Sequence, residues 1–216
     1  MKLHSVVGSP ACRKVEAAIR HMGVAIEIEY HDLIAGELKT PSYLEINPAG
    51  RVPAFEDGDL RLAESNAILV YLAVQAQSAL FPSDLKIRAQ ILQWMNFELA
   101  HFNRALGAIG FETVVRPALG LGETNGALVE AMQDNLVHSA AVLDGHLEGR
   151  SYLVGGDVTL ADYALMGGEV FKDAIAFDWA PYPNLNAYYD RMRKNPHVAA
   201  TALVDLARLG RRPEAA

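Results

Sequence analysis

The sequence predicts an α/β domain at the N-terminus followed by an all-helical domain. Two observations carry this prediction. Segments with strand and helix periodicity alternate up to about residue 75, whereas beyond residue 85 the apolar residues recur only at helical spacing. The chain has 216 residues, enough for two small domains that each bury a core. We therefore expect a first domain over residues 1–78, a linker over 79–85 and a helical domain over 86–216.

The first domain opens with a predicted strand, helix and strand. Residues 2–7 form a short apolar run that ends at Gly8-Ser9-Pro10, where glycine and proline favour a turn. Apolar residues at helical spacing then continue from Val15 to Met22 and stop at Gly23, a residue type suited to a helix C-terminus. Residues 26–31 alternate as a second strand. Such a unit is expected to place its two strands in parallel.

The rest of this domain is predicted as a short helix, a loop, a hairpin and a helix. The helix covers residues 41–46, and the loop over residues 47–53 is rich in proline and glycine. Asp57-Gly58 lies between two short apolar segments, a strong signal for an antiparallel hairpin. Ser65 is expected to be the N-cap of the next helix. The complete order, βαβ-α-ββα, is that of a thioredoxin-like domain.

The second domain contains two long predicted helices and several short ones. A helix through Trp94 and Phe102 is followed by a glycine-rich interruption over residues 116–122 and by a helix over residues 125–147. Thr159 and Asp162 have the spacing of a capping box at the start of another helix. Two shorter helices separated by prolines follow, and the polar tail over residues 211–216 is expected to be frayed.

Composition excludes several classes of function. The formal net charge is -7, and the sequence has no stripe of lysine and arginine of the kind that nucleic-acid binding requires. No apolar run is long enough for a membrane span, and the N-terminus does not resemble a signal peptide. A single cysteine indicates a reducing compartment, so we expect a cytoplasmic protein. The seven histidines show no His-x-x-x-His or Cys/His spacing, and no metal site is expected.

The segment Ser9-Pro10-Ala11-Cys12 carries the chemistry of the first domain. It lies where a strand leads into a helix N-terminus, which favours a negative charge such as a thiolate. Compared with a Cys-x-x-Cys redox pattern, serine occupies the first position, so a dithiol cycle is excluded. The remaining role for Ser9 is to donate a hydrogen bond to a thiolate on a ligand, although it is also a plain helix N-cap. Cys12 is a possible second thiol or simply a small buried side chain.

Four segments resemble the cytosolic glutathione transferases, and the likeness covers nearly the whole chain. The serine-type classes are most similar, with the phi class and its bacterial relatives nearest. The segments, in chain order, are Gly8-Ser9-Pro10-Ala11-Cys12-Arg13-Lys14-Val15, Asn47-Pro48-Ala49-Gly50-Arg51-Val52-Pro53-Ala54-Phe55, Asp57-Gly58 with Leu62-Ala63-Glu64-Ser65-Asn66-Ala67-Ile68, and Thr159-Leu160-Ala161-Asp162.

The resemblance implies roles for individual residues. Ser9 would hydrogen-bond the glutathione sulfur, and Val52, followed by a cis Pro53, would pair its backbone with the cysteinyl part. Glu64 and Ser65 would hold the γ-glutamyl group. Lys39 would face the glycyl carboxylate. Arg51 occupies a position often filled by Gln or Lys in the family, and its several donors would serve a carboxylate equally well. Leu38 stands where phi-type members commonly have a ligand-contacting histidine, which implies a more loosely held glycyl end.

The predicted function is conjugation of glutathione to a small hydrophobic electrophile. No tightly bound cofactor is expected, because glutathione itself is the cosubstrate. A glutathione-dependent isomerase, dehalogenase or peroxidase remains an alternative, as does a non-catalytic binding protein of the same fold. The resemblance also implies a homodimer. The electrophile is expected against an apolar wall of the helical domain, formed by Phe102, Leu106, Ile109, Phe111 and Val115.

Overall fold

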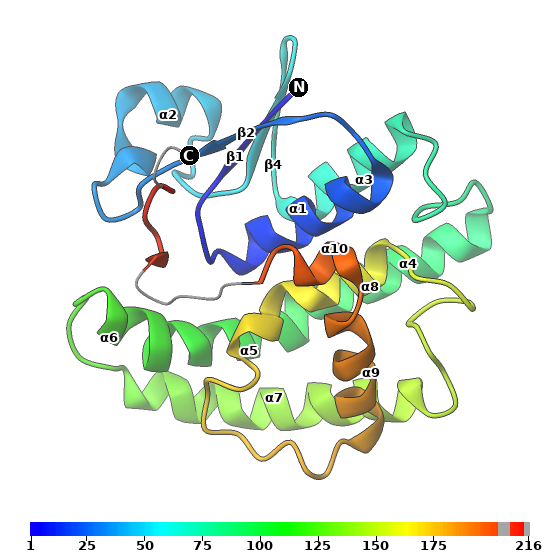
Figure 1. Ribbon diagram of the computed structural model, residues 1–216. Helices are drawn as coiled ribbons and strands as arrows, with labels where there is room; N and C mark the ends of the chain where they lie inside the picture. Colours follow the sequence, from blue (N-terminus) through cyan, green and yellow to red (C-terminus); the bar gives the residue numbers. More distant parts are fainter. Residues whose placement is uncertain (203–207, 214–216) are drawn as a thin grey trace.

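The computed structural model describes residues 1–202 and 208–213 and has a four-stranded sheet at one end and helices at the other (Figure 1). The strand order is β2-β1-β3-β4, with β1 parallel to β2 and antiparallel to β3. This arrangement confirms the predicted parallel unit and hairpin. The strands are β1 (Lys2–Ser5), β2 (Glu27–Tyr30), β3 (Ala54–Asp57) and β4 (Leu60–Ala63).

Helices cover both faces of the sheet. On one face, α1 (Pro10–Met22) and α3 (Ser65–Gln75) bury a core that includes Leu3 of β1 and Phe55 of β3. On the other face, the short 3₁₀ helix η1 (Glu37–Lys39) and α2 (Pro41–Ile46) enclose a smaller apolar cluster. The thioredoxin-like fold expected from the element order is thus the fold observed.

The start of α3 differs from the prediction. Glu64 occupies the N-cap position, and Ser65 is the first residue of the helix. Glu64 has a φ of 65°, in the left-handed region that few residues other than glycine adopt. With Ser65 as the cap, the helix would begin at residue 66. The turn at Glu64 makes it begin one residue earlier, at Ser65, which is therefore part of the helix and not its cap.

The first long helix of the second domain is continuous through two π-helical turns. It runs through α4 (Leu85–Phe97), the π turn η2 (Glu98–Phe102), α5 (Asn103–Gly110), the π turn η3 (Phe111–Val115) and α6 (Arg116–Ala118). The predicted interruption at residue 116 is wrong by three residues, because Arg116 is held in the helix by Glu112 at 2.7 Å.

The remaining helices pack around a buried centre. The long helix predicted over residues 125–147 is observed as α7 (Gly126–Leu147), and Asn125 caps it by accepting a hydrogen bond from the N–H of Leu128 at 3.1 Å. Asp162 is fully buried and accepts from the N–H of Thr159 at 2.7 Å, so the capping box is also confirmed. The elements that follow α7 are α8 (Leu160–Met166), the 3₁₀ helix η4 (Gly167–Phe171), α9 (Pro183–Arg193) and α10 (Pro196–Ala199).

Part of the C-terminal tail returns to the first domain. The N–H of Gly210 donates to the carbonyl of Val7 at 3.0 Å, and Arg212 pairs with Glu37 at 2.8 Å. Arg212 was expected in a frayed tail and is instead anchored, while residues 214–216 of that tail lie outside the described residues. Among the described residues, no helix combines the length and the apolar character that crossing a membrane would need.

Candidate functional site

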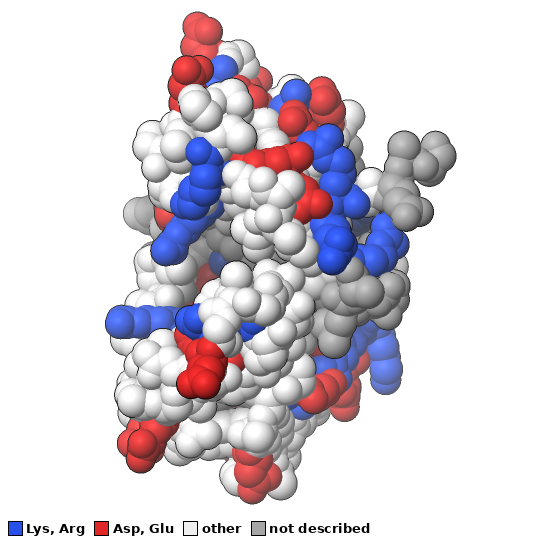
Figure 2. All heavy atoms as spheres, turned by 90° about the vertical axis from the view of Figure 1, so that its left-hand side faces the viewer, with Lys and Arg blue, Asp and Glu red and all other residues white. Residues whose placement is uncertain are grey.

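A cleft between the two domains brings most of the predicted binding residues together. It encloses about 340 Å³ and is bordered on one side by α1, the loop before β3 and the start of α3, and on the other by η2, α5 and η4. Figure 2 shows the molecule hollowed between its upper and lower parts, with lysine and arginine side chains bordering the hollow. The lining residues are Pro10, Ala11, Lys14, Asn47, Ala49, Arg51, Val52, Pro53, Glu64, Ser65, Glu98, Leu99, Asn103, Arg104, Gly107, Gly167, Gly168 and Phe171.

Ser9 is the N-cap of α1. Its Oγ accepts a hydrogen bond from the N–H of Cys12 at 3.4 Å, and the next two residues, Pro10 and Ala11, line the cleft. A hydroxyl that accepts one bond in this way keeps its own proton to donate elsewhere. The α1 N-terminus also places positive dipole ends near this position. Ser9 can therefore donate to an anion located at the start of α1.

Cys12 lies on the buried side of the same turn. Its side chain is 1% exposed. Burial raises the pKa of the Cys12 thiol to about 11, although the Ser5 and Ser9 hydroxyls act in the opposite direction. A thiol with so high a pKa is almost fully protonated at neutral pH, which disfavours nucleophilic or redox chemistry.

The loop before β3 presents a backbone edge to the cleft. The Val52-Pro53 peptide bond is cis, as the resemblance implied. The carbonyl of Arg51 is fixed from behind, because it accepts from Tyr43 Oη at 2.7 Å and from Asn47 Nδ2 at 2.8 Å. Within the described residues, the backbone N–H and C=O of Val52 form no hydrogen bond of the protein's own. They are available to an extended ligand chain.

Two cations lie beside this loop. Arg51 is exposed and lines the cleft. Lys39 extends from η1, where its Nζ donates to the carbonyl of Gly50 at 3.2 Å. Gly50 has a φ of +58°, and a Cβ there would lie 2.9 Å from the backbone carbonyl of Leu38, so glycine is required on both counts. The same Cβ would lie 2.6 Å from Lys39 Nζ, which would have to move. Lys39 itself is not among the lining residues and stands at the outer edge of the loop.

The N-terminus of α3 closes the same end of the cleft. Glu64 is exposed and Ser65 is buried, and both line the cleft. The first turn of a helix has N–H groups without intrahelical acceptors, which suits a carboxylate ligand. The Glu64 carboxylate next to it suits an ammonium group. The unfavourable φ of Glu64 is a type of strain that concentrates at binding sites.

A buried ion pair that no sequence pattern predicts forms part of the cleft wall. Lys14 of α1 donates to Glu98 of η2 at 2.7 Å and to Asn66 of α3 at 2.8 Å. Glu98 also accepts from Asn66 at 3.0 Å and from Asn103 at 2.6 Å. The ion pair joins the two domains directly across the cleft. No sequence spacing links residues 14 and 98, so only the fold reveals it.

The five residues predicted to form the electrophile wall are not among the residues that line the cleft. Phe102, Leu106 and Ile109 are buried in the helical core, at most 2% exposed. Phe111 is 40% exposed and lies under the Arg116 guanidinium at 5.3 Å. Val115 packs against the core from a partly buried position. The described residues that do line the helical side of the cleft include Leu99, Arg104, Gly107 and Phe171.

Comparisons with known proteins agree with this geometry. Residues 1–74 match the family model of the glutathione S-transferase N-terminal domain, and residues 102–196 match that of the C-terminal domain. A glutathione S-transferase from Hyoscyamus muticus is 33% identical over 211 residues, covering 96% of this chain and 94% of the relative.

Two solved structures are similar over nearly the whole chain. A possible glutathione S-transferase from Rhodopseudomonas palustris has a TM-score of 0.83 at 31% identity, covering 95% of this chain and 97% of that one. Glutathione S-transferase-I bound with lactoylglutathione has a TM-score of 0.82 at 29% identity, with coverages of 93% and 97%.

Proposed function

The chain belongs to the glutathione S-transferase family and is a glutathione transferase, and from that premise we propose that its interdomain cleft binds glutathione with the sulfur at Ser9. The observation that carries this assignment is the convergence of three backbone features on one cleft: the α1 N-terminus, the Val52-Pro53 edge and the α3 N-terminus.

Each part of the tripeptide meets a complementary group in this proposal. The γ-glutamyl carboxylate accepts from the start of α3 at Ser65, and its ammonium group faces Glu64. The cysteinyl backbone pairs with Val52. The glycyl carboxylate lies between Arg51 and Lys39, where two cations favour it. Leu38 is 3% exposed and belongs to the smaller apolar cluster, which supports a glycyl end held by Lys39 and Arg51 alone.

Ser9 stabilises the thiolate. A hydrogen bond to a charged group contributes about 1.5 to 3 kcal/mol, and one pKa unit corresponds to about 1.36 kcal/mol. Loss of the hydroxyl should therefore raise the pKa of bound glutathione by about 1–2 units. Ser9→Ala is the test, with the thiolate of bound glutathione titrated by its ultraviolet absorbance.

The matched control removes the neighbouring thiol. Cys12→Ala should leave the titration of bound glutathione unchanged, because Cys12 is buried behind the turn. Ser9→Thr keeps a hydroxyl and should restore part of the effect. An unchanged pKa in Ser9→Ala, with glutathione still bound, would remove Ser9 from the mechanism.

The electrophile occupies the helical side of the cleft in this proposal. Leu99 and Phe171 provide apolar surface, and Arg104 adds one cation. This combination favours a small hydrophobic electrophile with an oxygen acceptor, such as a nitroaryl halide or an unsaturated carbonyl compound. Turnover across such a panel distinguishes conjugation from isomerase, dehalogenase or peroxidase activity. Arg104→Met should lower turnover of acceptor-bearing substrates and leave the affinity for glutathione unchanged.

We further propose a cytoplasmic homodimer, as the family resemblance implies. An apolar groove between α3 and α4, lined by Val70, Tyr71, Leu92 and Met95 among others, supports a location for the interface. Leu92 is 39% exposed within this apolar groove, and the surfaces of monomeric proteins rarely expose such continuous apolar patches to water. Light scattering should give twice the chain mass, and Leu92→Glu should shift the protein toward the monomer.

A further inference from the structure

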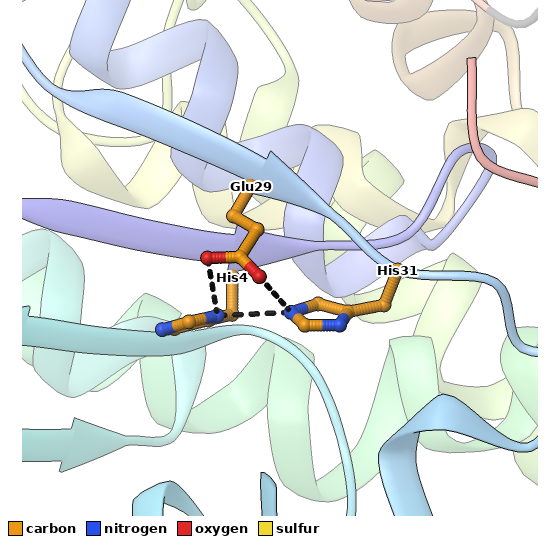
Figure 3. A group of neighbouring side chains, drawn as sticks. All are labelled: His4, Glu29 and His31. Carbon is orange, nitrogen blue, oxygen red and sulfur yellow. Dashed lines mark hydrogen bonds and ion pairs between the residues drawn. The ribbon is translucent and has the colours of Figure 1, made fainter. Parts of the chain in front are cut away.

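Two histidines and a glutamate meet on the face of the sheet that α2 covers, away from the cleft. His4 of β1 and Glu29 of β2 are direct partners in the parallel ladder, and His31 follows the end of β2. Figure 3 shows the two imidazole rings pointing toward each other with the Glu29 carboxylate above them. His4 and His31 are 2% and 7% exposed, whereas the Glu29 side chain is partly exposed.

The separations of the three potential ligand atoms suit one metal ion. His4 Nδ1 lies 2.9 Å from His31 Nε2. One carboxylate oxygen of Glu29, Oε2, lies 3.9 Å from His4 Nδ1, and the other, Oε1, lies 3.9 Å from His31 Nε2. Ligands about 2.0–2.1 Å from a tetrahedral ion lie about 3.3 Å apart. The three ligand atoms lie within 4.8 Å of one another, so shifts of up to about 1.5 Å between the side chains would give that geometry.

The outer ring nitrogens face carboxylates. His4 Nε2 lies 2.8 Å from Glu56 Oε1, and His31 Nδ1 lies 3.6 Å from Glu37 Oε2. A carboxylate only accepts hydrogen bonds, so the Glu56 contact favours an N–H on the outer nitrogen of His4 and a lone pair on its inner one. Glu37 is too far from His31 for a hydrogen bond, and its negative charge favours the same tautomer by electrostatics alone. Metal-binding histidines commonly have this second partner, which fixes the ring and the tautomer.

The inner nitrogens then need a cation between them. With both outer nitrogens as donors, two lone pairs face each other at 2.9 Å beside a third carboxylate, Glu29. Each of the three carboxylates has a cationic partner, since Lys2 binds Glu29 Oε2 at 2.9 Å, Arg61 binds Glu56 at 2.7 Å and Arg212 binds Glu37 at 2.8 Å. None of these cations lies between the two inner nitrogens, and Glu29 Oε1 stays toward His31. We propose that His4, Glu29 and His31 bind a divalent transition-metal ion of the zinc type.

The ligand set defines the class of ion. Two imidazoles and one carboxylate suit Zn²⁺ and similar ions, whereas Mg²⁺ and Ca²⁺ prefer oxygen ligands alone. Water would complete the coordination. Tyr43 links the site to the cleft loop, since its ring packs edge-on against His31 at 4.9 Å and its hydroxyl holds the Arg51 carbonyl. A bound ion would thus brace α2 from behind the loop without touching glutathione.

The test is metal binding by the full chain after removal of metal with a chelator. Zn²⁺ titration calorimetry should show one equivalent bound, and Co²⁺ should give the intense visible bands of a four-coordinate site with nitrogen ligands. Glu29→Gln and His31→Gln should each weaken binding at least ~10-fold and abolish the Co²⁺ bands. Glu27→Gln is the matched control, because Glu27 lies on the same strand and face, also pairs with Lys2 at 3.3 Å, and is not a ligand.

Several outcomes would overturn the proposal. Absence of Zn²⁺ binding by the wild-type chain would mean that a shared proton, not a metal ion, joins the two rings. Equal binding by wild type, Glu29→Gln and His31→Gln would assign the metal to other histidines. Should His31→Gln fail to fold, as judged by circular dichroism, the partly exposed Glu29 provides the decisive variant. None of these outcomes depends on glutathione binding.

Discussion

The ion pair between Lys14 and Glu98 should be one of the main links between the two domains. Glu98→Leu removes the carboxylate that receives Lys14 Nζ at 2.7 Å. The side chains are 4% and 2% exposed, so water does not replace the lost partner. Lys14 then keeps only the Asn66 Oδ1 at 2.8 Å. Leaving a buried charge without its counterion costs about 3–5 kcal/mol, and we expect the free energy of unfolding to fall by that amount.

A double-mutant cycle separates the ion pair from its surroundings. Lys14→Met should cost less than Glu98→Leu, because Glu98 retains the amide donors of Asn66 and Asn103 at 3.0 and 2.6 Å. The combined variant replaces both charges with apolar groups of similar size and should recover most of the lost stability. The coupling energy should therefore be at least about 2 kcal/mol.

Urea unfolding followed by tryptophan fluorescence measures these energies, since Trp94 lies on α4 within the helical core. Arg61→Met is the control: its partner Glu56 is at a similar distance of 2.7 Å, but Arg61 is 43% exposed. That surface pair should contribute less than about 1 kcal/mol. The reasoning is refuted if Glu98→Leu costs less than about 1 kcal/mol, or if the double variant is as unstable as the sum of the single ones.

Three further predictions concern single residues. Because burial raises the pKa of Cys12 to about 11, its thiolate fraction at pH 7.5 should be roughly 300-fold below that of free cysteine. Labelling of Cys12 by iodoacetamide should therefore be slow at neutral pH and should accelerate up to pH 11, and fast labelling at neutral pH would contradict this. Gly50→Ala should lower the free energy of unfolding by about 1–3 kcal/mol, because of its positive φ, and should raise the KM for glutathione, because the new Cβ would displace Lys39. Gly58→Ala is the control: its φ is a similar +56° but no atom lies within 4 Å of the new Cβ, so it should show the loss of stability alone. Asp162→Ala should lower the free energy of unfolding by about 2–4 kcal/mol, because the buried N–H groups of Leu153 and Thr159, which donate hydrogen bonds to this carboxylate, lose their acceptor. A melting temperature within a degree of wild type would refute that role.

Local signals were sufficient for the first domain. The Asp57-Gly58 hairpin and the helix stop at Gly23 depend on backbone preferences of a few adjacent residues, and the structure has both. The start of α3 was misplaced by one residue, since an N-cap serine is a statistical preference that the turn at Glu64 overrides. Such local preferences locate an element but do not fix its first residue.

The helical side of the cleft was not predictable from periodicity. Phe102, Leu106 and Ile109 recur at helical spacing and therefore share one face, but periodicity does not say whether that face meets a core or a ligand. The structure buries it. The π turn at residues 98–102 also shifts the helix register there, a change that leaves no clear mark in the apolar pattern.

The histidine cluster depended on strand pairing. His4 and Glu29 are 25 positions apart and become neighbours only through the parallel register of β1 and β2. The spacing rules used for metals describe ligands on one helix or in one loop, so they do not detect ligands shared by two strands. One sequence signal was available, because Glu29 and His31 have the i, i+2 spacing that places side chains on one face of a strand.

Helix α1 connects the cleft to the domain interface, because two of its charged residues, Arg13 and Lys14, are buried against the second domain. Lys14 pairs with Glu98, and Arg13 pairs with Glu169 of η4, which also receives Arg193. Gly167 lets η4 approach closely, since a Cβ there would lie 2.8 Å from the carbonyl of Pro10. Buried ion pairs tolerate little displacement, as a partly separated pair exposes uncompensated charge in a dry environment. The N-terminus of α1 is therefore fixed against the helical domain before any ligand binds, which supports the proposal that Ser9 donates to the sulfur of glutathione.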